Sequence, residues 1–126
     1  MEKLTMKSFT HLSGTEAITR SNEHGGSGQI HFRRLLSASD FDAPIDFVDF
    51  TVVPPQSRIG WHSHHGNEET YFVASGSPLV RVEGDQRRLS KGDIAVVRSG
   101  QSHELINDTS EDVEILVFQV RLVEGS

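Results

Sequence analysis

The sequence predicts an all-β domain of the sandwich or barrel type. After residue 30 the chain divides into short runs rich in β-branched and aromatic residues, separated by Gly, Pro, Ser, Asn or Asp. No window of helical length in that part keeps the period of an amphipathic helix. The length of 126 residues corresponds to one domain of ordinary size.

The expected elements follow from these runs in chain order. Residues 1–29 are expected to form an irregular N-terminal arm, because residues 21–28 are too rich in glycine for a regular element. Residues 30–126 are expected to form a single β-barrel domain. Its strands are predicted at residues 30–36, 45–53, 69–74, 79–83, 86–89, 94–97, 103–107 and 113–120.

The last predicted strand is apolar on both faces. One face carries Val113, Ile115 and Val117, and the other carries Leu116, Phe118 and Val120. A strand of this kind is buried on both sides. If one face lies inside the barrel, the other needs a cover, which is the N-terminal arm or a second subunit. The alternative is a strand partly covered by its own loops.

Composition excludes several classes of function. The chain has no cysteine, which excludes a thiol nucleophile and cysteine-ligated zinc or iron–sulfur sites. The net charge of −6 makes nucleic acid a poor partner, because phosphate backbones repel an acidic surface. No apolar run is long enough to span a membrane. The N-terminus lacks the apolar stretch of a secretory signal, so we expect a cytoplasmic protein.

Several of the seven histidines are spaced as metal ligands are. His62 and His64 stand two positions apart, which on a strand directs both imidazoles to the same face. A carboxylate at Glu69, at the start of the next strand, would add an anionic ligand. Glu68 is the alternative, since a shift of one residue exchanges the faces of a strand. His103 begins a later strand and would supply a third imidazole if the sheet folds back.

These residues resemble the motifs of the cupin superfamily. The first motif, G-x5-H-x-H-x(3,4)-E-x6-G, is matched by His62, His64, Glu69 and Gly76, with Gln56 in place of the leading glycine. The second motif, G-x5-P-x-G-x2-H-x3-N, is matched by Gly92, Gly100, His103 and Asn107, with Arg98 in place of the proline. The resemblance covers about residues 45–120.

The resemblance implies a jelly-roll β-barrel that holds one divalent transition metal ion. The ligands of the family map onto His62, His64, Glu69 and His103. Three imidazoles and one carboxylate suit Fe, Mn, Ni, Co, Cu or Zn, and the ligand types do not choose among them. Because the family commonly pairs its barrels, we also predict a homodimer.

The predicted function is a metal-dependent enzyme that acts on a small polar substrate inside the barrel. The metal would act as a Lewis acid, in isomerase, lyase, cyclase or dioxygenase chemistry. Tyr71 shares the face of Glu69, and it is the candidate catalytic proton donor or simply a packed aromatic. Asn107 is expected to hold a backbone turn. The alternative function is a module that binds or senses a small ligand without turnover.

Overall fold

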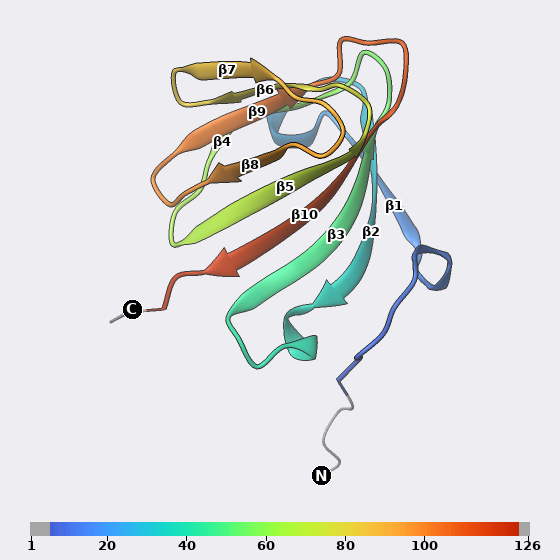
Figure 1. The fold of residues 1–126 in the computed structure, drawn as a ribbon, viewed down its shortest axis with the longest axis vertical. Helices are drawn as coiled ribbons and strands as arrows, with labels where there is room; N and C mark the ends of the chain where they lie inside the picture. Colours follow the sequence, from blue (N-terminus) through green and yellow to red (C-terminus); the bar gives the residue numbers. More distant parts are fainter. Residues whose placement is uncertain (1–5, 124–126) are drawn as a thin grey trace.

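Two antiparallel sheets face each other in the computed structural model, which describes residues 6–123 (Figure 1). The six-stranded sheet has the order β1-β2-β3-β10-β5-β8, and the four-stranded sheet has the order β4-β9-β6-β7. The strands of the six-stranded sheet are β1 (Ala17–Ser21), β2 (Gln29–Ser37), β3 (Ile45–Val53), β5 (Asn67–Ser75), β8 (Ile94–Val97) and β10 (Val113–Arg121). The second sheet contains β4 (Arg58–Ser63), β6 (Leu79–Val82), β7 (Asp85–Arg88) and β9 (Ser102–Ile106). The all-β prediction is confirmed.

Helical structure in the described residues consists of short 3-10 turns. These turns are η1 (Leu12–Gly14), η2 (Glu23–Gly25) and η3 (Ala38–Asp40). Within residues 6–123, no helix is both long and apolar enough to cross a membrane.

Most strands lie where the alternation of residues predicts them, but two segments differ. β1 lies inside the arm that the sequence describes as irregular, and it pairs with β2 along the sheet edge. All five residues of β1 are exposed, so it carries no apolar alternation that would mark it in the sequence. β4 contains a glycine and has a β-bulge opposite β9, which also weakens its strand pattern.

The core lies between the two sheets. Val53, Val73 and Ile115 of the six-stranded sheet are fully buried, and they pack with Val80 and Leu105 of the four-stranded sheet. The face of β10 that carries Val113, Ile115 and Val117 is therefore internal. Several core residues, among them Tyr71, Ile115 and Val117, also line a cavity that holds polar side chains.

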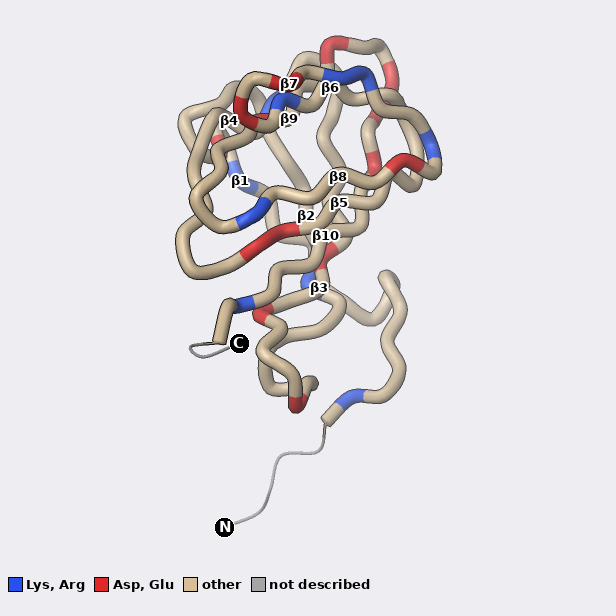
Figure 2. Tube along the Cα trace, turned by 60° about the vertical axis from the view of Figure 1, so that its left-hand side comes forward, with Lys and Arg blue, Asp and Glu red and all other residues tan. Residues whose placement is uncertain are grey.

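The opposite face of β10 is covered only in part. The arm lies against β2, where the Arg33 guanidinium donates hydrogen bonds to the carbonyl oxygens of Leu12 and Thr15. Farther along the same sheet, Phe72 on β5 and Ile94 on β8 remain 39% and 60% exposed. Figure 2 shows that basic and acidic residues are interspersed along the described chain, over both sheets.

Candidate metal centre

Strand pairing brings the predicted histidines together. His62 on β4 is the cross-strand partner of His103 on β9, although the two are far apart in sequence. His64 follows the end of β4, and its backbone is held by hydrogen bonds to Gln101 and Gly100. The candidate ligand nitrogens of the three histidines lie within 4.8 Å of one another. His103 is fully buried, and His64 is 7% exposed.

The Nδ1 atom of each histidine already has a partner. Nδ1 of His62 lies 2.8 Å from the carbonyl oxygen of Gly60, and Nδ1 of His64 lies 2.7 Å from Oδ1 of Asn67. Both partners can only accept, so these two Nδ1 atoms carry the proton and the Nε2 atoms keep a lone pair. Nδ1 of His103 is hydrogen-bonded to the hydroxyl group of Tyr71.

The Nε2 atoms converge on one point. Nε2 of His103 lies 2.9 Å from Nε2 of His64 and 3.1 Å from Nε2 of His62. Nitrogens bound side by side at about 2.1 Å to one ion are separated by roughly 3 Å. One proton on His103 can satisfy only one of its two neighbours, which leaves lone pairs facing each other. A shared cation removes this conflict, and the donor set therefore fits a metal ion.

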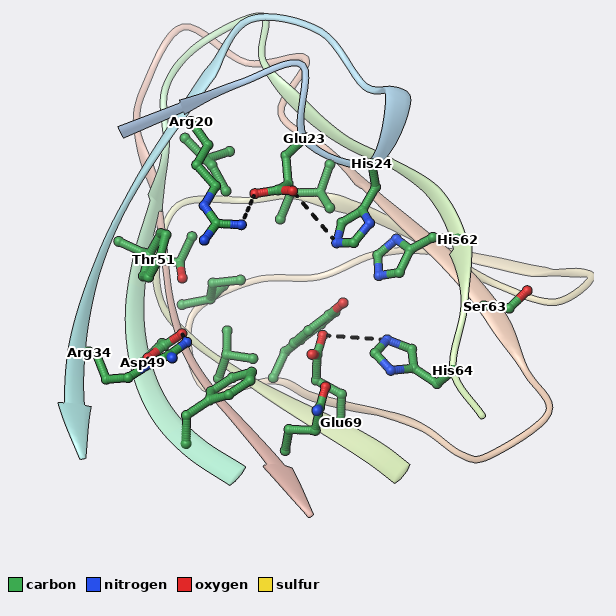
Figure 3. Close-up of a pocket in the computed structure, with 18 residues that line it drawn as sticks. Arg20, Glu23, His24, Arg34, Asp49, Thr51, His62, Ser63, His64 and Glu69 are labelled. Atoms are coloured by element: carbon green, nitrogen blue, oxygen red, sulfur yellow. Dashed lines mark hydrogen bonds and ion pairs between the residues drawn. The ribbon is translucent and has the colours of Figure 1, made fainter. Parts of the chain in front are cut away.

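The carboxylates at positions 68 and 69 are directed differently. Glu69 lines the cavity beside His62 and His64 (Figure 3). Its carboxylate oxygen lies 3.9 Å from Nε2 of both His64 and His103. Glu68 is absent from the residues that line this cavity. Glu69 is the nearer of the two to the cluster, and its role as a ligand stays a prediction.

Burial sets the protonation of His62 and His103. Burial, with smaller contributions from the neighbouring imidazoles of His62 and His64, lowers the pKa of His103 to about 3. Burial also lowers the pKa of His62. These imidazoles are neutral at neutral pH, as metal ligation requires. Burial raises the pKa of Glu69 to about 7, against the attraction of His64 and with the repulsion of Asp49.

Tyr71 is positioned by β5, two residues after Glu69 and on the same face. It is 2% exposed, and its hydroxyl also lies 3.1 Å from Nε2 of His103. The hydrogen bond of the hydroxyl with Nδ1 orients the His103 ring, which is what an outer partner of a metal ligand does. The catalytic role of Tyr71 stays a prediction.

The cavity beside the cluster has a volume of about 370 Å³. Its far wall holds Asp49 and Arg34, which form a two-point ion pair with distances of 2.9 and 3.1 Å. The N-terminal arm contributes Arg20, Glu23 and His24 (Figure 3). His24 stacks on His62, with ring centroids 3.7 Å apart.

Sequence reasoning missed Asn67 and His24. Asn67 stands directly before Glu68 and Glu69, but an amide that accepts a hydrogen bond from a histidine has no characteristic spacing in the sequence. His24 lies in the glycine-rich segment of the arm, and only the docking of η2 on β4 brings it to the site.

The sequence matches a known protein family. Residues 49–119, more than half of the chain, match the sequence model of the Cupin domain family. The chain belongs to this family. The resemblance seen in the two motifs is confirmed, and so is the jelly-roll fold.

This cupin is similar to several known proteins. An oxalate-binding protein of Thermotoga maritima is 29% identical over 102 residues, which are 81% of this chain and 84% of that protein. The tetracenomycin polyketide synthase protein TcmJ of Streptomyces glaucescens is 28% identical over 104 residues, or 82% of this chain and 66% of that protein. The crystal structure of a predicted oxalate decarboxylase from Thermotoga maritima has a TM-score of 0.87 at 27% identity, and the match covers 90% of this chain and 99% of that one.

Proposed function

We propose that this cupin is a metal-dependent enzyme that holds a small carboxylate such as oxalate at a metal ion bound by His62, His64, Glu69 and His103. The convergence of the three Nε2 atoms, with each Nδ1 already held, carries the metal site. The oxalate-binding relative supports the ligand class.

The metal, when bound, would supply Lewis-acid polarisation of a ligand oxygen. The residues of the chain prepare the site for this. Gly60, Asn67 and Tyr71 orient the imidazoles, and the sheets on both sides shield the cluster from water. Three neutral imidazoles and one carboxylate leave a divalent ion with a positive net charge, which favours an anionic ligand.

A binding protein without turnover is the second candidate, and the name of the oxalate-binding relative favours it. Both candidates need the same metal site. They differ in whether the bound carboxylate is consumed.

We also propose that the protein is a homodimer that pairs through the outer face of the six-stranded sheet. Cross-strand pairing places Phe50, Leu116, Phe72 and Ile94 in one row over four neighbouring strands. An uncharged row of this kind can meet its own copy across a two-fold axis.

The decisive experiment compares metal-loaded and chelator-treated protein. We expect about one transition metal ion per chain, and oxalate binding by calorimetry only in the loaded protein. His62→Ala combined with His64→Ala should remove the metal, whereas Gln86→Ala on the exposed strand β7 should not. A double variant that keeps its metal through gel filtration contradicts the site. Oxalate that is bound but never consumed favours the binding protein.

A further inference from the structure

We propose that the N-terminal arm adds a second subsite to the cavity, in which Arg20 binds an anionic group of the ligand at the end remote from the metal. The ligand is then an organic acid longer than oxalate, with a chelating pair of oxygens at one end and a carboxylate at the other. This inference rests on the proposed function only in that one end of the ligand is held at the metal.

The cavity is larger than oxalate requires. Its volume of about 370 Å³ lies within the range of roughly 300–1,000 Å³ that proteins use for ligands of drug size. Oxalate has two carbon atoms and occupies only the part next to the histidines. The remaining space is bounded by polar side chains of β1, β3 and η2.

Arg20 offers hydrogen-bond donors to a ligand in the cavity. The guanidinium of Arg34, the other arginine of the cavity, is already engaged by Asp49 at two points. The described polar contact of Arg20 is an ion pair with Glu23 at 3.7 Å, which exceeds hydrogen-bond distance. Its guanidinium lies 5.1 Å above the ring of Phe32 and is directed into the cavity (Figure 3). A planar fork of donors in this position suits a carboxylate.

The N-terminal arm is held at a defined place on β4. A Cβ atom on Gly26 would lie 2.1 Å from the carbonyl oxygen of Arg58, and one on Gly60 would lie 2.2 Å from the carbonyl oxygen of His24. The two backbones therefore touch through glycines that have no room for a side chain. Hydrogen bonds between Ser27 and Arg58 fix the same contact.

A chain of contacts links this subsite to the metal centre. Glu23 lies 3.7 Å from Arg20 and 3.8 Å from His24, and His24 stacks on His62 (Figure 3). Along this path two intervening side chains separate Arg20 from the nearest predicted ligand. An acid with a longer carbon chain than oxalate suits a site that has one end at the histidines and the other at Arg20.

The test uses two ligands with the same chelating end. 2-Oxoglutarate carries a distal carboxylate, and 2-oxopentanoate has a methyl group in its place. Calorimetry on the metal-loaded protein should show at least about tenfold tighter binding of 2-oxoglutarate, the scale of one charged hydrogen bond. Arg20→Gln should remove this preference and leave oxalate affinity and metal content unchanged. Arg87→Gln, at an exposed arginine of β7, serves as the control and should keep the preference.

A second pair of variants tests the position of the arm. Gly26→Ala should lose the preference while keeping its metal, whereas Gly14→Ala, in open space on the same arm, should behave as wild type. Equal binding of the two oxo acids by wild-type protein that still binds oxalate overturns the subsite and leaves the proposed function standing. An Arg20→Gln variant that weakens oxalate as much as 2-oxoglutarate also overturns it. Loaded protein that binds no oxalate contradicts the proposed function instead.

Discussion

At the scale of single residues, the candidate centre depends on groups that hold the histidines as much as on the histidines themselves. The Gly60 carbonyl and the Asn67 amide fix which nitrogen of His62 and His64 is protonated. The residue types and spacing of the ligands are visible in the sequence. Their tautomers depend on oxygens that reach the rings only in the folded chain.

Tyr71 provides a direct test at this scale. Replacing Tyr71 with Phe removes the hydroxyl from Nδ1 of His103 and leaves the ring in place. Loss of such an outer hydrogen bond should weaken metal affinity about 10- to 100-fold. A competition titration with a chromogenic chelator measures this change.

Two outcomes separate the roles of Tyr71. A variant that binds metal as tightly as wild type but turns over no substrate identifies a proton donor. A variant unchanged in both measurements leaves the hydroxyl without either role. Phe47→Leu, at another aromatic residue of the cavity wall, is the matched control for altered packing.

At the scale of elements, Asn107 joins three segments at the closed end of the sandwich. Its side-chain amide donates to the carbonyl oxygens of Val53 at 2.8 Å and Glu111 at 2.7 Å, and its oxygen accepts from Thr109. Its backbone pairs with Gln56 and Ser57 in the loop before β4. The predicted role of Asn107 in holding a turn is confirmed.

Asn107→Ala should therefore destabilise the fold without touching the site. The side chain is fully buried, and its removal takes one donor from each of two carbonyl oxygens. We expect the free energy of unfolding to fall by about 2–3 kcal/mol. Urea denaturation measures the change, with Gln86→Ala on the exposed strand β7 as the control. A loss no larger than that of the control would mean that water replaces the amide.

At the scale of the whole molecule, the exposed apolar residues of the six-stranded sheet bear on assembly. We expect a mass of two chains in sedimentation equilibrium at micromolar concentration. Phe72→Glu should shift the protein to one chain, because it places a charge in the centre of the apolar row. Gln86→Glu adds the same charge to the other sheet and should leave the dimer intact. A wild-type mass of one chain contradicts the dimer.

Much of the architecture is predictable because successive side chains of a strand face opposite sides of the sheet, so neighbouring residues show which faces are apolar. β10 carries its two apolar faces in neighbouring residues, and β3 and β5 are recognisable in the same way. β1 is not recognisable, since a fully exposed edge strand is specified by its pairing with β2 and not by its own pattern. The arm was therefore expected to be irregular.

The sequence by itself determined the all-β class, the family and the residue types of the candidate metal centre, because these depend on alternation and on fixed spacing. Only the tertiary structure decided that His103 pairs with His62, that Glu69 and not Glu68 lines the cavity, and that the arm builds one wall. Each of these depends on contacts between segments remote in sequence. The close approach of Gly26 and Gly60 is the clearest case, because a glycine shows that a side chain is missing but not which backbone fills the space.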